Sequence, residues 1–70
     1  MKVVFTLHAE EQMAERKIVK QWVEEAIKQP DFIEKEGGKH YSMKKINSHL
    51  LKVVYVKENY IKVVTCYFIK

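Results

Sequence analysis

The chain of 70 residues is 47% hydrophobic and carries 13 Lys and Arg against 9 Asp and Glu, a net charge of +4. This length allows one domain, residues 1–70, and the hydrophobic content excludes a disordered chain. The single cysteine excludes an internal disulfide, no Cys/His spacing matches a zinc site, and no apolar run reaches the roughly 18 residues of a membrane span.

The first half of the chain is predicted to form a short strand and two helices. Lys2 to Leu7 is β-branched and aromatic, which favours a strand. Thr6 offers a side-chain oxygen as the N-cap of a helix from His8 to Arg16. Lys17 is expected to break the chain before a second helix, Val19 to Gln29, which ends because Pro30 follows. The apolar stripe of the second helix has helical spacing: Val19, Trp22, Val23, Ala26 and Ile27.

The second half is predicted to form four strands joined by short turns. Gly37-Gly38, Asn47-Ser48 and Glu58-Asn59 are the expected turns. The expected strands are Phe32 to Glu36, Lys39 to Ile46, His49 to Lys57 and Tyr60 to Ile69. Short connections favour an antiparallel meander. The predicted fold is therefore α+β in the order β-α-α-β-β-β-β, with two N-terminal helices packed on a four-stranded antiparallel sheet and a short N-terminal strand.

The register of the last hairpin determines which side chains share a face. If Lys57 pairs with Tyr60, Lys52 lies opposite Thr65, and both faces of the hairpin are largely apolar. Helices on one face would then leave an apolar second face, which we expect a partner, a second copy or a ligand to cover. Association with another chain is also a usual source of stability for so small a domain.

His8 and Arg16 are the candidate catalytic residues. The helix dipole disfavours the imidazolium at a helix start, so neutral His8 is suited to act as a base or an acid. Arg16 is the single arginine among the basic residues, and its planar guanidinium binds phosphate through two hydrogen bonds. The structural alternative is that both residues complement the two ends of one helix.

Cations and aromatic rings on the predicted strands are the candidate RNA contacts. Lysines hold phosphate and tyrosine rings stack on bases. The residues expected in this role are Tyr41, Lys44, Lys45, Lys52, Thr65 and Tyr67. The alternative for each lysine is a solvated charge that deters aggregation of strand edges. We find no phosphate loop, catalytic triad or metal motif, and we expect Cys66 to be packed and inert.

The motif F-T-L-H-A-x-x-x-M-x-x-R-x-I from Phe5 to Ile18, with V-V-T-C-Y near the end, resembles a small bacterial family catalogued as a domain of unknown function, number forty-two fifty-eight. The layout looks like the RelE/ParE/BrnT toxin superfamily. The resemblance implies a metal-independent ribonuclease without cofactors, paired with an antitoxin protein. His8, Arg16, Thr65 and Tyr67 match its motif positions, whereas Lys17 stands where the family often has glycine.

These observations support two hypotheses of different classes. The first is a toxin-like endoribonuclease or RNA-binding domain in which His8 and Arg16 point toward the groove that the sheet's cations line. The second is a non-enzymatic protein-interaction module that docks a protein partner, which can be a second copy of the chain, through an apolar sheet face. The single free cysteine and the first residues, which lack a signal-peptide cleavage site, indicate a cytoplasmic protein without a membrane partner.

Overall fold

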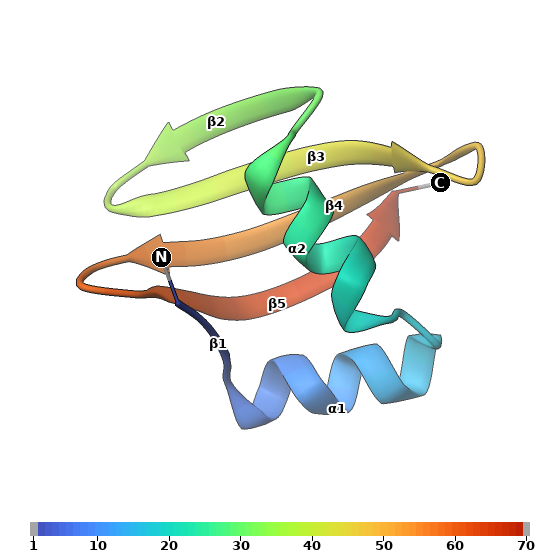
Figure 1. The fold of residues 1–70 in the computed structure, drawn as a ribbon, viewed down its shortest axis with the longest axis horizontal. Helices are drawn as coiled ribbons and strands as arrows, with labels where there is room; N and C mark the ends of the chain where they lie inside the picture. Colours follow the sequence, from blue (N-terminus) through green and yellow to red (C-terminus); the bar gives the residue numbers. More distant parts are fainter. Residues whose placement is uncertain (1, 70) are drawn as a thin grey trace.

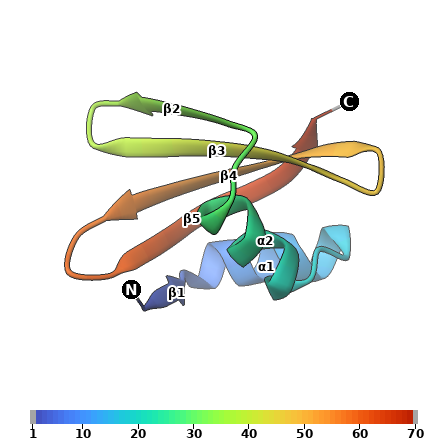
Figure 2. The ribbon, with the colours of Figure 1, turned by 45° about the horizontal axis from the view of Figure 1, so that its top comes forward.

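A computed structural model of the chain describes residues 2–69, which form two helices and one five-stranded sheet. The strand order in the sheet is β1-β5-β4-β3-β2. Both helices lie on the same side of this sheet, α2 across the middle strands and α1 below β5 (Figure 1, Figure 2). The elements along the chain are β1 Val3–Phe5, α1 Leu7–Arg16, α2 Lys20–Lys28, β2 Phe32–Glu36, β3 Lys39–Ile46, β4 His49–Lys57 and β5 Ile61–Ile69.

Local capping explains where α1 begins and ends. The Thr6 side-chain oxygen accepts a hydrogen bond of 3.0 Å from the Ala9 backbone N–H, which confirms the predicted N-cap. Lys17 ends the helix in the left-handed conformation, with φ 57° and ψ 43°. The N–H of Ile18 then returns to the Met13 carbonyl at 2.8 Å and that of Lys17 donates to the Ala14 carbonyl at 3.4 Å, so two free carbonyls of the last turn have partners.

The apolar stripe of α2 is confirmed at four of its five positions. Val23 and Ala26 are fully buried, and Trp22 and Ile27 pack partly buried against the core. Val19 is 47% exposed, so its predicted place in the stripe is wrong. Ile18 is buried in its stead, because Lys17 reverses the chain direction and turns the following residue inward.

The predicted antiparallel meander of the last four strands is confirmed. Its first two turns have positive φ at both central residues, namely Gly37, Gly38, Asn47 and Ser48. This geometry matches the twist of the strands that it joins.

The prediction of a four-stranded antiparallel sheet is wrong in one respect, because β1 adds a fifth strand parallel to β5. The Ile61 N–H donates to the Lys2 carbonyl at 2.8 Å, and the Thr6 N–H donates to the Val63 carbonyl at 3.1 Å. Val3 and Phe5 pack against the core from this strand. The sheet is therefore mixed, and β1 covers an edge of β5 that would otherwise stay unpaired.

The predicted register of the last hairpin is also wrong. Lys57 pairs with Ile61 rather than Tyr60, so the connection has three residues instead of two. The register shifts once more beside Val54 and Tyr55, so that Lys52 lies opposite Tyr67 rather than Thr65. A one-residue slip exchanges the two faces of a strand. The predicted faces of β5 are therefore exchanged only at its start, from Ile61 to Val63. Beyond the second shift the slip amounts to two residues, which restores the predicted faces, so Thr65 and Tyr67 share a face with Lys52.

This register gives the sheet two different faces. The face under the helices, which we call the helix face, is closely packed and apolar; its fully buried side chains include Leu51, Val53, Val63 and Cys66. The opposite face, which we call the open face, carries lysines and tyrosines among its apolar side chains. The expectation of two largely apolar faces was made for the last hairpin and is confirmed there, although lysines interrupt the open face: this face carries Leu50, Val54, Val56, Tyr67 and Ile69 beside Lys52, Lys62 and Thr65. No helix in residues 2–69 is long and apolar enough to span a membrane.

Candidate nucleic-acid interface

Five of the six predicted RNA contacts lie on the open face. Tyr41, Val54 and Thr65 are neighbours in one row across β3, β4 and β5, and Met43, Lys52 and Tyr67 form the next row. The grouping of Lys52, Thr65 and Tyr67 on one face is confirmed, although their pairing differs from the prediction. Lys45 belongs to the same face, opposite Leu50.

Lys52 is the central cation of this face. Its Nζ lies 5.1 Å from the centroid of the Tyr41 ring, a cation–π contact. Lys52, Tyr41 and Tyr67 are all half-buried, so neighbours hold their side chains while part of each residue remains accessible. A positive charge between two aromatic rings suits a single strand of nucleic acid, whose bases stack on rings while its phosphates need cations.

Lys44 is the exception among the predicted contacts, because it points to the helix face. Its Nζ donates a hydrogen bond of 3.0 Å to the carbonyl of Gln29, the C-cap residue of α2. A cation at a helix C-terminus satisfies a free carbonyl and complements the helix dipole. Lys44 thus contributes to holding α2 on the sheet.

His8 and Arg16 lie at the two ends of α1, on the other side of the sheet from Lys52. Both are exposed, and they are separated by about 12 Å along the helix axis and about 80° around it. Among residues 2–69, neither side chain forms a hydrogen bond or an ion pair with another described residue. The expectation that they point into the groove lined by the sheet's cations is wrong, because α1 packs on the helix face through Ala9 and Met13.

Cys66 is buried on the helix face, as predicted. Burial raises the pKa of the Cys66 thiol from 9.0 to about 11, and the positive charge of Arg16 opposes this shift. The thiol is therefore protonated near neutral pH, which leaves little of the reactive thiolate.

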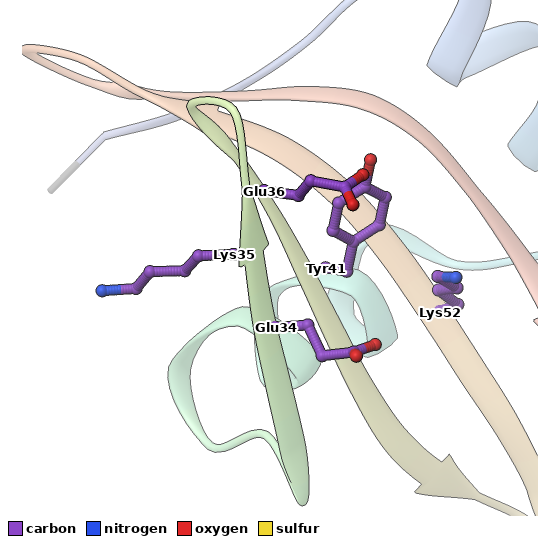
Figure 3. Close-up of a pocket in the computed structure, with 5 residues that line it drawn as sticks. All are labelled: Glu34, Lys35, Glu36, Tyr41 and Lys52. Carbon is purple, nitrogen blue, oxygen red and sulfur yellow. The ribbon is translucent and has the colours of Figure 1, made fainter.

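A hollow of about 240 Å³ opens at the β2 side of the open face. Its lining residues are Glu34, Lys35, Glu36, Tyr41 and Lys52. In Figure 3, four of these side chains project to one side of the strands, whereas Lys35 projects to the opposite side. A wider hollow of about 650 Å³ lies at the other end of the strands, lined by Lys45, Ser48, His49, Leu50 and Ile69.

The sequence interpretation missed Glu34 and Glu36. The Gly37-Gly38 turn contained the required signal, because a two-residue turn sets Glu36 opposite Lys39 and therefore Glu34 opposite Tyr41. Within the described part of the chain, no group of three or more His, Cys, Asp or Glu side chains is placed to hold a metal ion.

Together these features define an α+β domain in which two helices cover one face of a five-stranded mixed sheet and leave a basic and aromatic face open. The chain belongs to the family described as Domain of unknown function (DUF4258), whose model matches residues 5–68. No curated protein and no solved structure matches the chain.

Proposed function

We propose that this protein binds single-stranded RNA on the open face of its sheet. The arrangement of Tyr41, Lys52 and Tyr67 carries the proposal, since two rings and a central cation from three adjacent strands offer stacking and phosphate contacts together. The net charge of +4 favours association with a polyanion. The likeness of the layout to the RelE/ParE/BrnT toxin superfamily, whose toxins are commonly ribonucleases, favours RNA as the nucleic acid.

The test measures the affinity of short labelled RNA oligonucleotides by fluorescence anisotropy at several salt concentrations. We expect Tyr41→Ala and Tyr67→Ala each to weaken binding at least about fivefold through lost stacking. Lys52→Gln should weaken it and reduce the slope of log affinity against log salt by about 0.7. Lys28→Gln is the matched control, because it removes an exposed charge from α2, across the sheet. Equal effects of Lys28→Gln and Lys52→Gln would contradict the proposal.

Cleavage of RNA by His8 and Arg16 is a separate hypothesis. In-line attack of a ribose 2′-OH needs a base, an acid and a cation around one phosphate. In this structure the two residues stand more than two helical turns apart, so the cleavage site would have to form at α1 and not on the open face. Expression of the parent protein, His8→Ala and Arg16→Ala followed by analysis of cellular RNA tests it. Intact RNA with the parent protein would rule out catalysis.

The free edge of β2 favours a second candidate function, self-association as an interaction module. Phe32 is 62% exposed and Ile33 47% exposed on this strand, whose one hydrogen-bonded neighbour is β3. An unpaired edge with apolar side chains is a template for strand addition. A second copy would extend the sheet here, and an antitoxin strand would compete for the same edge.

Proline at position 33 tests this edge. The Asp31 N–H donates to the Met43 carbonyl and the Lys45 N–H donates to the Asp31 carboxylate, so odd-numbered residues of β3 face β2. By the alternation of an antiparallel pair, Ile33 therefore directs its N–H outward. Ile33→Pro should abolish dimers in light scattering with little loss of melting temperature. A parent protein that stays monomeric at millimolar concentration would exclude self-association.

A further inference from the structure

The hollow beside Tyr41 combines three kinds of chemistry in a small space. Glu34 and Glu36 supply carboxylates from β2, Tyr41 supplies a ring from β3, and Lys52 supplies an ammonium group from β4. These four side chains project to the same side of the strands (Figure 3). At about 240 Å³ the hollow is smaller than typical sites for drug-sized ligands, and it suits a single ring system.

The carboxylates of Glu34 and Glu36 are unexpected on a face proposed to bind the phosphates of RNA. Among residues 2–69, neither Glu34 nor Glu36 forms an ion pair, since the ion pair between Lys20 and Glu10 is the one found there. Unpaired carboxylates repel a phosphate backbone, so they would weaken RNA binding unless they met hydrogen-bond donors. Nucleobases offer such donors on their Watson–Crick edges.

We propose that this hollow binds one guanine base of the RNA strand, an inference that rests on the proposed function. Guanine has two adjacent donors, N1–H and the N2 amino group, which together match the two oxygens of a carboxylate. Its O6 acceptor suits Lys52. Lys52 lies on the β4 side of Tyr41, and the glutamates lie on the β2 side, where the base edge would reach them.

The same chemistry ranks the other bases. Adenine and cytosine each offer one amino group beside an acceptor nitrogen, so a carboxylate gains one favourable contact and meets one repulsive one. Uracil offers a single N–H between two carbonyl oxygens. The expected order of affinity is therefore guanine first, then adenine and cytosine, then uracil.

The experiment uses labelled oligouridines of about eight nucleotides with one central position varied. A central guanosine should tighten binding to the parent protein by about tenfold over uridine. Inosine keeps N1–H and O6 but lacks the amino group, so it should lose most of this gain. This comparison needs no protein variant and does not depend on how any variant folds.

Replacing either glutamate should change two measured quantities in opposite directions, the affinity for oligouridine and the preference for guanosine. Glu34→Gln and Glu36→Gln should strengthen binding of plain oligouridine, because a charge that repels phosphate is removed, and should reduce the preference for guanosine. Glu58→Gln is the matched control, since Glu58 is exposed in the β4–β5 turn outside the hollow. It should leave the base preference unchanged.

The outcomes separate the two proposals. If no oligonucleotide binds the parent protein, the proposed RNA binding fails, and the guanine site fails with it. If all oligonucleotides bind with equal affinity, or if inosine binds as tightly as guanosine and the glutamine variants keep the preference, the guanine site is overturned while RNA binding stands. The glutamates would then serve as charges that keep the β2 edge from aggregating.

Discussion

The two faces of this sheet are built from alternating residues of the same strands, yet they differ in composition and packing. On β4, Leu51 and Val53 point into the helix face and have no exposed surface, while Leu50 and Lys52, which alternate with them, point to the open face and are half-buried. Folding is thus driven on one face, and the other is free to carry charge and aromatic rings. Side chains one residue apart can therefore be changed with separate consequences for stability and for binding.

The sharpest test of this division compares two adjacent leucines. Leu51→Ala should lower the free energy of unfolding by about 2–5 kcal/mol, because it leaves a cavity beneath the helices. Leu50→Ala removes the same atoms from the open face and should cost about 1 kcal/mol. Urea unfolding measures both. Equal losses would mean that the open face is packed as tightly as the helix face.

The second test uses pH, because Cys66 belongs to the helix face. Its folded pKa of about 11 exceeds the ordinary value of 9.0, so folding favours the protonated thiol. Between these values the unfolded chain has released a proton that the folded chain retains, and stability falls as pH rises, by up to about 2–3 kcal/mol. Below pH 9 the contribution is fully present.

Cys66→Ala is the control for this pH dependence. The variant is destabilised at all pH values by its cavity, but its unfolding free energy should fall less steeply from pH 9 to 11 than that of the parent protein. A thiol reagent should react with Cys66 in the parent only as fast as the chain opens. Identical pH slopes in parent and variant would show that other groups cause the decline.

Local signals in the sequence were sufficient for the first three strands of the meander. The predicted bounds of β2, β3 and β4 agree with the structure, because two-residue turns such as Gly37-Gly38 fix both the strand ends and the pairing. The next connection has three residues rather than two, because Tyr60 joins the turn rather than β5. This one residue, with the register shift beside Val54, brings Ile61 and Val63 rather than Lys62 and Val64 to the helix face, and leaves the rest of β5 facing as predicted.

The candidate site was predictable only where it depends on the alternation along a strand. Alternation places Lys52 and Val54 on one face, but it does not tell which face the helices cover. That choice depends on contacts between distant segments, such as Trp22 against Phe68 at a ring separation of 6.1 Å. Contacts of this kind also hold α1 against the sheet through Ala9 and Met13. His8 and Arg16, at the two ends of α1, are thereby placed across the sheet from the lysines of the open face.

A third prediction concerns the attachment of the helix layer to the sheet. Thr6 both caps α1 and donates a hydrogen bond of 3.2 Å to the carbonyl of Val64, close to the register shift of β5. Thr6→Val keeps the shape but removes both bonds, and should cost about 1–2 kcal/mol. Thr6→Ser keeps the hydroxyl and should restore most of this loss. Melting curves that rank serine no higher than valine would contradict a role for the oxygen.

The smallest expected effect lies where the helix layer is strained and the sheet is not involved. Lys17 holds a left-handed backbone, with φ 57°, that glycine adopts without cost, and its side chain is exposed. Lys17→Gly should raise the free energy of unfolding by about 0.5–1 kcal/mol. Lys17→Ala is the matched control, because it removes the charge but keeps the Cβ, and it should leave stability nearly unchanged. A gain from alanine equal to that from glycine would assign the effect to charge rather than to the backbone. RNA affinity should be the same in both variants and the parent, since Lys17 lies in the helix layer and the proposed contacts lie on the open face.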